Sequence, residues 1–289
     1  MQAADLEVSR PRYLQERQVA LWACLVSYLI IAAPIVYWLW QRWTMSIWHN
    51  GHGIFVPFLV AFLTWETLRD DPAKDEKASS AWGFAFLGPA MLLIILDSAA
   101  DTQILSALAL VLSLPGLSLL LLGARRAKAL AFPCILALFM LPIPAAFIDP
   151  LILKLRIISS IGSEKLVELS GIPVIREGTT LLLPDAAVAI ADACSGFSTL
   201  YASLTFALLF AHMSSSPARK LILVLAAAPV AIAANILRCA WLVLLVHSYG
   251  SEILETPLHV GSGFVSFLTA LGILALLARW ESPRRLTRS

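Results

Sequence analysis

Long apolar stretches alternate with short polar breaks along most of the chain. Most of these stretches approach the roughly 20 residues that an α-helix needs to cross the hydrocarbon core of a bilayer. The polar breaks contain charged residues, Gly and Pro. The pattern predicts a bundle of about eight membrane-spanning helices, over residues 19–40, 54–68, 82–98, 104–122, 129–147, 194–212, 220–247 and 260–279.

The longest connection between these stretches, residues 148–193, has a different pattern. From Pro150 to Leu169 apolar residues recur at helical spacing, which predicts an amphipathic helix lying along the membrane interface. The following GIPVIREGTTLLLPDAAVAIAD has short apolar runs broken by Gly and Pro, which predicts short β-strands. We therefore expect an all-α integral membrane protein with one such loop. Its single membrane domain covers residues 19–280, between polar tails at 1–18 and 281–289.

The composition supports this fold class. Hydrophobic residues make up 59% of the 289 residues and charged residues 14%, whereas soluble domains contain roughly 25% charged residues. The net charge of +2 is too small to indicate binding of nucleic acid. The four cysteines show neither a CxxC motif nor the spacing of a zinc site, so we expect no metal and no cofactor.

The distribution of basic residues predicts the orientation of the bundle. Fifteen of the 21 basic residues lie before the first apolar stretch or after the second, fourth, sixth and eighth. The positive-inside rule places these segments in the cytoplasm. Both termini are then cytoplasmic, and the loop at 148–193 lies on the extracytoplasmic side of the membrane.

This topology brings three reactive side chains to one depth. Cys194, in the segment ADACSGFS, begins the sixth apolar stretch at its outer end. Arg238 follows Lys220 by 18 residues, which is about 27 Å along a helix that starts in the cytoplasm. His259 directly precedes the eighth stretch and therefore also lies outside. Because the three residues belong to separate helices, their side chains can converge in the bundle.

Together these side chains have the chemistry of a cysteine nucleophile. A nearby cation or a helix N-terminus favours the thiolate of Cys194. We expect His259 to take the thiol proton and to return it to a leaving amine. Arg238 would bind the substrate carbonyl or the developing oxyanion. Asn235, one turn earlier on the same helix, would orient Arg238 or donate a hydrogen bond itself. Such a site breaks an amide bond through an acyl-thioester.

Each of these residues also has a simpler interpretation. An isolated cysteine in a membrane helix is usually a packing residue, and Cys194 is also able to pair with Cys239 in a disulfide. Arg238 could merely extend toward the interface, although an arginine inside a membrane helix is costly enough to indicate a functional site. His247 also lies near the outer end and is the main alternative to His259 as the base.

The segments ADACSGFSTLYA, ANILRCAW and LHVGSGFVSF, in this order, resemble the exosortase and archaeosortase family of prokaryotic membrane cysteine transpeptidases. HNGHGIFVPFLVAFLTW and the stretch at 132–184 extend the resemblance to about residues 49–275. It implies that Cys194 is the nucleophile, Arg238 the essential arginine and His259 the third catalytic residue. Ser195 belongs to the same ACSG element, and Asp192 keeps the negative charge at a position where family members often carry Glu.

The resemblance also implies a substrate. The family acts on exported proteins that end in a Pro-Glu-Pro-type motif, a transmembrane helix and a basic tail, often together with exopolysaccharide systems. We therefore expect a multi-pass protein of the prokaryotic cytoplasmic (inner) membrane that cleaves such signals at the outer face. The expected partners are these proteins, membrane lipid and exopolysaccharide machinery, but no nucleic acid. Arg176 in the outer loop is our prediction for the residue that binds the acidic motif.

Other function classes remain open at this point. A transporter or an exopolysaccharide-assembly component without enzymatic activity would use Arg238 as a gate and would not need Cys194. An enzyme of lipid or glycan transfer would need clustered carboxylates for a metal ion and a diphosphate, and the outer acidic residues form no DxxD-like pair. The third alternative is a catalytically inactive scaffold with the same fold.

Overall fold

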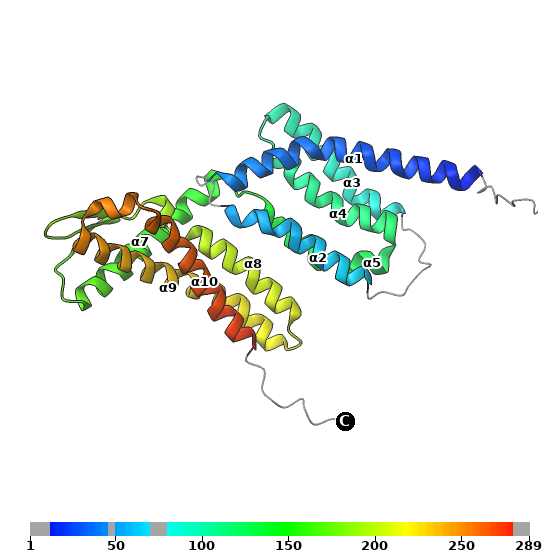
Figure 1. Ribbon diagram of the computed structural model, residues 1–289. Coiled ribbons are helices and arrows are strands. Elements are labelled where there is room, and N and C mark those ends of the chain that lie inside the picture. Colours follow the sequence, from blue (N-terminus) through cyan, green and yellow to red (C-terminus); the bar gives the residue numbers. More distant parts are fainter. Residues whose placement is uncertain (1–11, 46–49, 70–79, 280–289) are drawn as a thin grey trace, which may run out of the picture.

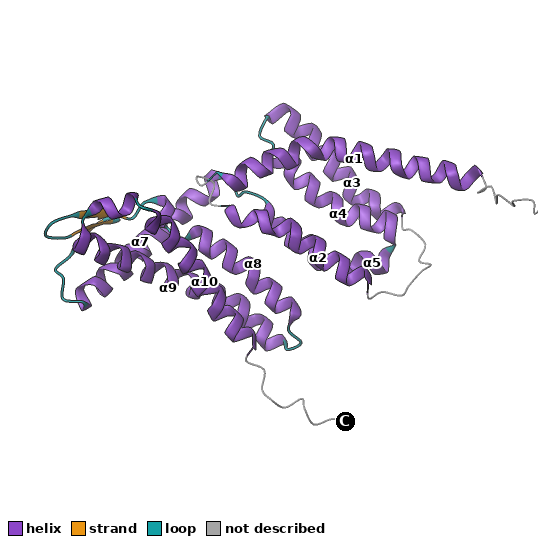
Figure 2. Cartoon of the chain, viewed as in Figure 1, coloured by secondary structure: helices purple, strands orange, loops and turns teal. Residues whose placement is uncertain are grey.

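The computed structural model describes residues 12–45, 50–69 and 80–279, and it is almost entirely helical (Figure 2). The predicted all-α membrane fold with a few short strands is confirmed. The expected tail at 281–289 and residues 1–11 of the expected N-terminal tail lie outside the described residues.

The α-helices are α1 (Arg12–Thr44), α2 (Phe55–Arg69), α3 (Ser80–Ala100), α4 (Ile104–Leu122), α5 (Ala124–Ala129), α6 (Ala131–Leu136), α7 (Ala145–Leu169), α8 (Phe197–Met213), α9 (Pro217–Tyr249) and α10 (Pro257–Arg279). Short 3-10 helices are η2 (Gly51–Ile54), η3 (Ala137–Met140), η4 (Asp192–Cys194) and η5 (Ser251–Glu255).

The helices form two groups (Figure 1). One contains α1 to α5, and the other contains α7 to α10 with the small sheet. The groups meet where α6 and η2 contact α8. A buried apolar cluster centred on Leu39, Val56 and Leu136 lies at this junction and joins α1, α2 and α6. Leu209 of α8 belongs to the same cluster, so burial of these side chains fixes the end of α1 and the start of α2 against the second group.

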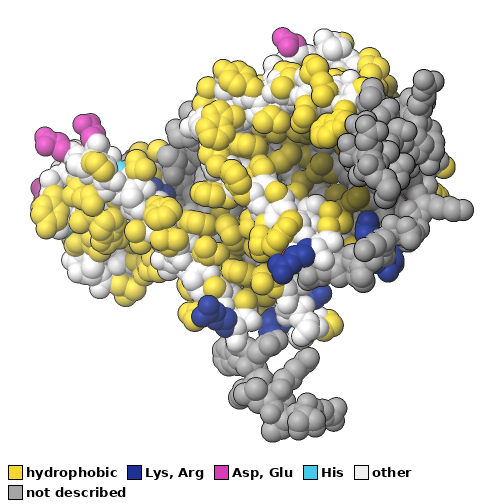
Figure 3. All heavy atoms as spheres, turned by 45° about the vertical axis from the view of Figure 1, so that its right-hand side comes forward, with side chains coloured by type: hydrophobic (Ala, Val, Ile, Leu, Met, Phe, Trp, Pro, Cys, Tyr) yellow, Lys and Arg dark blue, Asp and Glu magenta, His cyan; other side chains and the backbone are white. Residues whose placement is uncertain are grey.

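Five helical segments in the described part of the chain are long and apolar enough to cross a membrane. They coincide with five of the predicted stretches, and many of their large apolar side chains, such as Phe58, Trp82 and Phe264, are exposed. Figure 3 shows apolar side chains over much of the visible face, as expected for a surface in contact with lipid. The segments are Gly51–Arg69, Ala81–Ala100, Ile104–Leu122, Pro217–Tyr249 and Pro257–Arg279.

The predicted span at 129–147 is not one straight helix. The first helical part ends at Met140 and α7 begins at Ala145, and the two parts are bent by 78°. The break falls on Pro142 and Pro144. Proline lacks the N–H that a helix needs and disfavours helical geometry in the residue before it. A sixth span exists among the described residues only if this bent pair is counted as one.

The sixth predicted stretch also differs from the structure. It corresponds to α8, which has 17 residues and begins at Phe197 rather than at Cys194. Cys194 instead ends η4, and Gly196 with φ of +80° separates it from α8. The first predicted stretch lies within the 33-residue α1, which is not among the five spans. By length and composition, the described chain thus has five or six spans where about eight were expected.

The loop at 148–193 is built as predicted, with a helix followed by strands. The helix is α7, which begins five residues earlier than expected and packs one face on α9. The strands β1 (Ile175–Glu177), β2 (Thr180–Leu182) and β3 (Ala187–Ala189) form an antiparallel sheet in the order β1-β2-β3. Leu181 and Val188 are paired across the sheet and pack with Val243 of α9 in one buried cluster. The sheet therefore covers the C-terminal half of α9.

Basic side chains gather at the end of the molecule away from the sheet. The C-terminal ends of α2, α8 and α10 and the start of α9 lie at this end (Figure 1), and blue side chains mark its surface (Figure 3). His212 at the end of α8 stacks on Phe132 there, at 3.8 Å between ring centroids. The segments after the second, fourth, sixth and eighth predicted stretches thus lie toward one end of the fold. Their described basic residues are Arg69, Arg125, Arg126, Lys128, Arg219, Lys220 and Arg279.

The end of α1 and the residue before η2 are fixed against η3 by two hydrogen bonds to one carbonyl oxygen. Trp43 Nε1 donates to the Met140 oxygen at 2.8 Å, and Asn50 Nδ2 donates to the same oxygen at 3.2 Å. Gly53 is buried directly under the Trp43 ring, so that a Cβ at this position would lie 2.4 Å from Nε1. Glycine at this position therefore allows the close approach that orients the turn.

We predict that Gly53→Ala lowers the stability of the protein by about 1–3 kcal/mol, because the added methyl group displaces Trp43 and weakens its hydrogen bond. The measurement is thermal unfolding of the purified protein in detergent. Gly51→Ala is the matched control in the same turn, since its nearest neighbouring atom would lie 3.7 Å away. Equal Tm values for the two variants would contradict the prediction.

Candidate active site

Cys194 and His259 face each other between η4 and the first turn of α10. The Cys194 Sγ lies 3.8 Å from the His259 Nε2, within hydrogen-bonding range for sulfur. Cys194 is buried, with 6% of its surface exposed. His247, the alternative base, is exposed near the end of α9. The structure therefore places His259 beside the thiol, as the topology predicted.

Asn235 holds the backbone of Cys194. Its side chain is 1% exposed, and Nδ2 donates to the Cys194 carbonyl oxygen at 2.9 Å and to Ser159 Oγ at 2.9 Å. Gly196 packs directly on this amide, because a Cβ there would lie 2.5 Å from the Asn235 Cγ. Of the two roles expected for Asn235, the structure thus shows hydrogen-bond donation, and it is directed to the cysteine segment.

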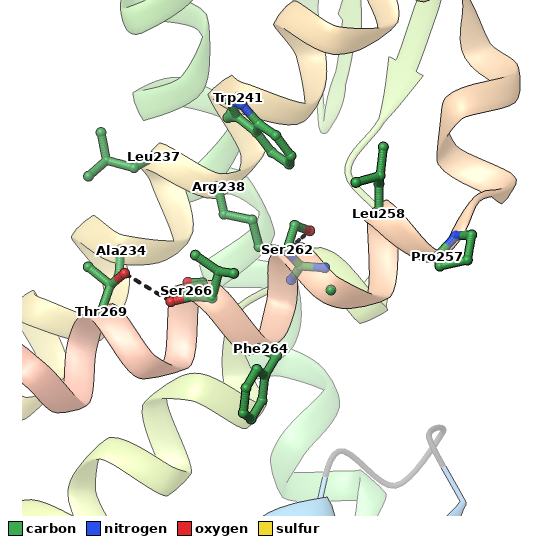
Figure 4. A pocket seen from close by; sticks show the side chains of 12 residues that line it. Ala234, Leu237, Arg238, Trp241, Pro257, Leu258, Ser262, Phe264, Ser266 and Thr269 are labelled. Atoms are coloured by element: carbon green, nitrogen blue, oxygen red, sulfur yellow. Dashed lines mark hydrogen bonds between the residues drawn. The ribbon is translucent and has the colours of Figure 1, made fainter.

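Arg238 reaches from α9 to the first turn of α10, as Figure 4 shows. Its Nε donates to Ser262 Oγ at 2.9 Å, and its Nη2 donates to the His259 carbonyl oxygen at 3.3 Å. Ser262 Oγ in turn donates to the same His259 oxygen at 2.7 Å. The guanidinium is thereby fixed on the turn that carries His259. Ser262 was not predicted, although it follows His259 by three residues and is a polar residue in an apolar helix.

The surroundings of Cys194 do not favour the thiolate as the sequence suggested. Burial raises the pKa of the Cys194 thiol above its ordinary value, and the nearby Arg238 guanidinium only partly opposes this effect. The expected contribution of a helix N-terminus is small, since Cys194 precedes the first residue of α8 by three positions. The thiol is therefore protonated near neutral pH, and it needs a base such as His259 to become a nucleophile.

Asp192 is engaged by a residue that the sequence analysis did not single out. Its Oδ1 accepts a hydrogen bond from Arg156 Nη1 at 2.7 Å. Arg156 Nε also donates to the Ile190 carbonyl oxygen at 2.6 Å, and Nη2 donates to Thr179 Oγ1 at 3.1 Å. Arg156 thus ties the segment before Cys194 to α7. No sequence pattern reveals a contact between residues 36 positions apart.

Two other predicted residues have local partners. Ser195 is buried, and its Oγ accepts a hydrogen bond from the Phe197 backbone N–H at 3.3 Å. Arg176 lies in β1 and donates to Glu164 Oε2 at 3.0 Å and to the Gly178 oxygen at 3.0 Å. The structure therefore brings Cys194, Asn235, Arg238 and His259 together, but holds Arg176 within the outer loop.

The thiol of Cys194 is free. Cys239 is free as well, and its Sγ lies 3.5 Å from the Cys194 carbonyl oxygen. The alternative of a Cys194–Cys239 disulfide is therefore not what the structure contains. Within the described ranges, no three His, Cys, Asp or Glu side chains come close enough together to hold a metal ion.

A cavity of about 630 Å³ leads to this site. Its lining includes Gly196 before α8, Arg238 of α9 and His259 of α10. The end of α1 and the turn η2 also contribute to the lining, with Trp43 and His52. A second hollow of about 930 Å³ between α9 and α10 also reaches Arg238 and is lined mainly by apolar side chains (Figure 4). Arg238 and His259 thus border spaces between the helices.

We predict that alkylation of Cys194 by iodoacetamide is slow at pH 7 and becomes roughly tenfold faster for each pH unit up to the raised pKa. Arg238→Gln removes the charge that lowers the pKa, so that the thiolate fraction at pH 8 falls and the rate drops by roughly tenfold. Mass spectrometry of the Cys194 peptide measures both rates. Arg219→Gln is the control, and an equal effect of the two substitutions would disprove the role of Arg238.

We further predict that Arg156→Gln lowers the stability by about 1–3 kcal/mol, because hydrogen bonds of a charged group to three partners are lost. The loosened segment should also expose Cys194, which would increase its alkylation rate at high pH. Lys154→Gln, an exposed position on the same helix, should leave both unchanged. Unaltered unfolding and alkylation in Arg156→Gln would show that the segment is held by other contacts.

Comparison with known protein families gives one match. The model of the transmembrane exosortase family matches residues 40–276, which include Cys194, Arg238 and His259. The comparisons with curated proteins and with solved structures gave no match. Since the matched region covers most of the chain, the chain belongs to the transmembrane exosortase family.

Proposed function

We propose that this chain is a membrane cysteine peptidase or transpeptidase that removes the C-terminal sorting signal of exported proteins. The signal consists of a Pro-Glu-Pro-type motif, a transmembrane helix and a basic tail. The observation that carries the proposal is the 3.8 Å contact between Cys194 Sγ and His259 Nε2. Arg238 is hydrogen-bonded to the same turn as His259, and a cavity leads to that turn.

The reaction uses these three side chains in turn. His259 Nε2 takes the proton of the Cys194 thiol, and the thiolate attacks the carbonyl carbon of the scissile peptide bond. Arg238 donates hydrogen bonds to the oxyanion that forms. The C–N bond then breaks, the leaving amine takes the proton from His259, and the acyl group remains as a thioester. Water or an acceptor amine then attacks the thioester carbonyl and gives a proton to His259 Nε2. The C–S bond breaks, and His259 returns this proton to the Cys194 thiolate.

The cavity has a shape that suits the helix of the signal. It follows α10 from His259 to Leu271, which is about 18 Å of helix. The wall of α10 along this length is largely apolar, including Phe264 and Phe267. A transmembrane helix lying beside α10 would place the residues that precede it near Cys194. Arg176 is proposed to meet the acidic motif further out.

The remaining supporting roles concern the position of the nucleophile. Asn235 holds the Cys194 carbonyl oxygen, and Asp192 ties the preceding residues to Arg156. Ser195 accepts a hydrogen bond from the turn that leads into α8. We propose that these contacts keep Sγ directed at His259 during both steps of the reaction.

We propose that the site faces the extracytoplasmic side of the inner membrane of a prokaryote, with both termini in the cytoplasm. The gathering of basic side chains at the end away from the sheet supports this orientation (Figure 3). The scissile bond would then lie at the outer surface, where an exported protein emerges from the bilayer. Membrane lipid and exopolysaccharide machinery are the further partners of this proposal.

Co-expression with a tagged protein that ends in such a signal tests the function. We expect the wild-type chain to shorten the tagged protein on a blot of membranes, and Cys194→Ala to abolish the shortening. His259→Gln should slow it by roughly 10²–10⁴-fold, because proton transfer is lost. Cys134→Ala, in α6, serves as the matched control and should cleave normally. Cleavage by Cys194→Ala would exclude the cysteine mechanism.

A further inference from the structure

Two buried serines lie one turn apart on α10, and their hydroxyl groups differ in what they contact. Ser262 is 6% exposed and Ser266 is 4% exposed. Ser262 Oγ accepts a hydrogen bond from Arg238 Nε at 2.9 Å and donates one to the His259 carbonyl oxygen at 2.7 Å. Ser266 Oγ has no hydrogen-bond partner among the described residues. Of these two serines, Ser262 is therefore the one that is bonded to the candidate site, and it lies beside Arg238 in Figure 4.

Three hydrogen bonds form a closed triangle on one edge of the Arg238 guanidinium. Nε donates to Ser262 Oγ, Nη2 donates to the His259 oxygen at 3.3 Å, and the serine hydroxyl joins the two acceptors. A guanidinium is planar, and its N–H groups have fixed directions. Two bonds on the edge that Nε and Nη2 share therefore fix the rotation of the whole group.

The contact with Ser262 is the stronger of these two restraints. Hydrogen bonds from N–H groups to oxygen are typically about 2.7–3.2 Å long. The bond from Nε, at 2.9 Å, lies within this range, and the bond from Nη2, at 3.3 Å, lies beyond it. The next residue of α10 also approaches the guanidinium, since a Cβ on Gly263 would lie 3.4 Å from Arg238 Cζ. Without the Ser262 hydroxyl, the guanidinium would stay beside α10 but would lose the acceptor that sets its rotation.

This rotation matters because Arg238 has to meet the oxyanion of the proposed reaction with N–H groups of Nη1 or Nη2. Donors stabilise an oxyanion most when they already point to the place where the charge develops. An error of about 1 Å in the position of a reacting or stabilising group can cost roughly 10²-fold in rate. A residue that sets the direction of Arg238 therefore affects the chemical step more than the binding of substrate.

We propose that Ser262 is a positioning residue, which holds the Arg238 guanidinium in the orientation that the chemical step requires. This inference rests on the proposed function and deepens it by one side chain. Ser262 acts through Arg238 and touches neither the substrate nor the thiol. Because Ser262 follows His259 by one helical turn, the same part of α10 then positions both the base and the arginine.

Cleavage kinetics of detergent-solubilised protein test this role. The substrate is a fluorescent peptide with a Pro-Glu-Pro segment, an apolar helix and a basic tail. We expect Ser262→Ala to lower kcat by roughly 10–100-fold and to change KM by less than about twofold. Ser262→Thr keeps a hydroxyl that is able to bond the same carbonyl oxygen, and should retain kcat within about threefold. Ser266→Ala is the matched control and should have the wild-type kcat.

A double-mutant cycle on the alkylation of Cys194 tests the link to Arg238 without any substrate. Arg238→Gln is expected to slow alkylation at pH 8 by roughly tenfold. Ser262→Ala alone should slow it by about threefold, because a misoriented guanidinium stabilises the thiolate less. In protein that already carries Arg238→Gln, Ser262→Ala should have no further effect, since the group on which it acts is absent.

The two experiments separate positioning from packing. The proposal is wrong if Ser262→Ala cleaves with the wild-type kcat, or if Ser266→Ala loses as much activity as Ser262→Ala. It is also wrong if Ser262→Ala slows alkylation equally with and without Arg238→Gln, because the serine would then act independently of the arginine. Failure of the proposed function is distinct, since wild-type protein would then leave the peptide uncleaved. In that case the alkylation cycle alone decides whether Ser262 orients Arg238.

Discussion

The arrangement of the site depends on two polar side chains of α9 that must find partners inside an apolar bundle. An amide or a guanidinium buried without partners costs several kcal/mol. Asn235 finds the carbonyl oxygen of Cys194, and Arg238, one turn further, finds that of His259. A single helix therefore holds both candidate catalytic residues, Cys194 and His259, by their main chains. When the bundle buries α9, the polar side chains of this helix need hydrogen-bond partners. The contact between Cys194 Sγ and His259 Nε2 follows from these hydrogen bonds.

The outer loop restrains the same segment from the opposite side. Its sheet packs Leu181 and Val188 on the C-terminal half of α9, in the cluster that also contains Cys194. Arg156 of α7 binds the residues just before the cysteine. Because η4 is a single turn, it would have few interactions of its own to fix the thiol. Contacts with α7 and the sheet therefore make the segment around Cys194 rigid, as a long helix would otherwise do.

Much of this arrangement was predictable from apolar runs and charge, because both are local properties of the sequence. They gave the helical fold, the strands of the loop and the common position of Cys194 and His259. The break at Pro142 and Pro144 was not predicted. The span was assigned from its apolar residues, and the effect of the two prolines on the helix was not considered. The contacts of Arg156 and those of Ser262 with Arg238 depend on tertiary packing. The periodicity of the sequence contains no information about such packing.

The protonated resting state of Cys194 is consistent with the side of the membrane that we propose for it. A thiolate is both the nucleophile and the form most readily oxidised, and an extracytoplasmic site is exposed to oxidising conditions. Burial raises the pKa of the Cys194 thiol and so favours the thiol over the more readily oxidised thiolate. In the proposed reaction, His259 takes the proton, and the thiolate would then lie near two cations, His259 and Arg238. Their attraction offsets part of the cost of ionising a buried thiol, so a reactive thiolate is formed only with its base in place.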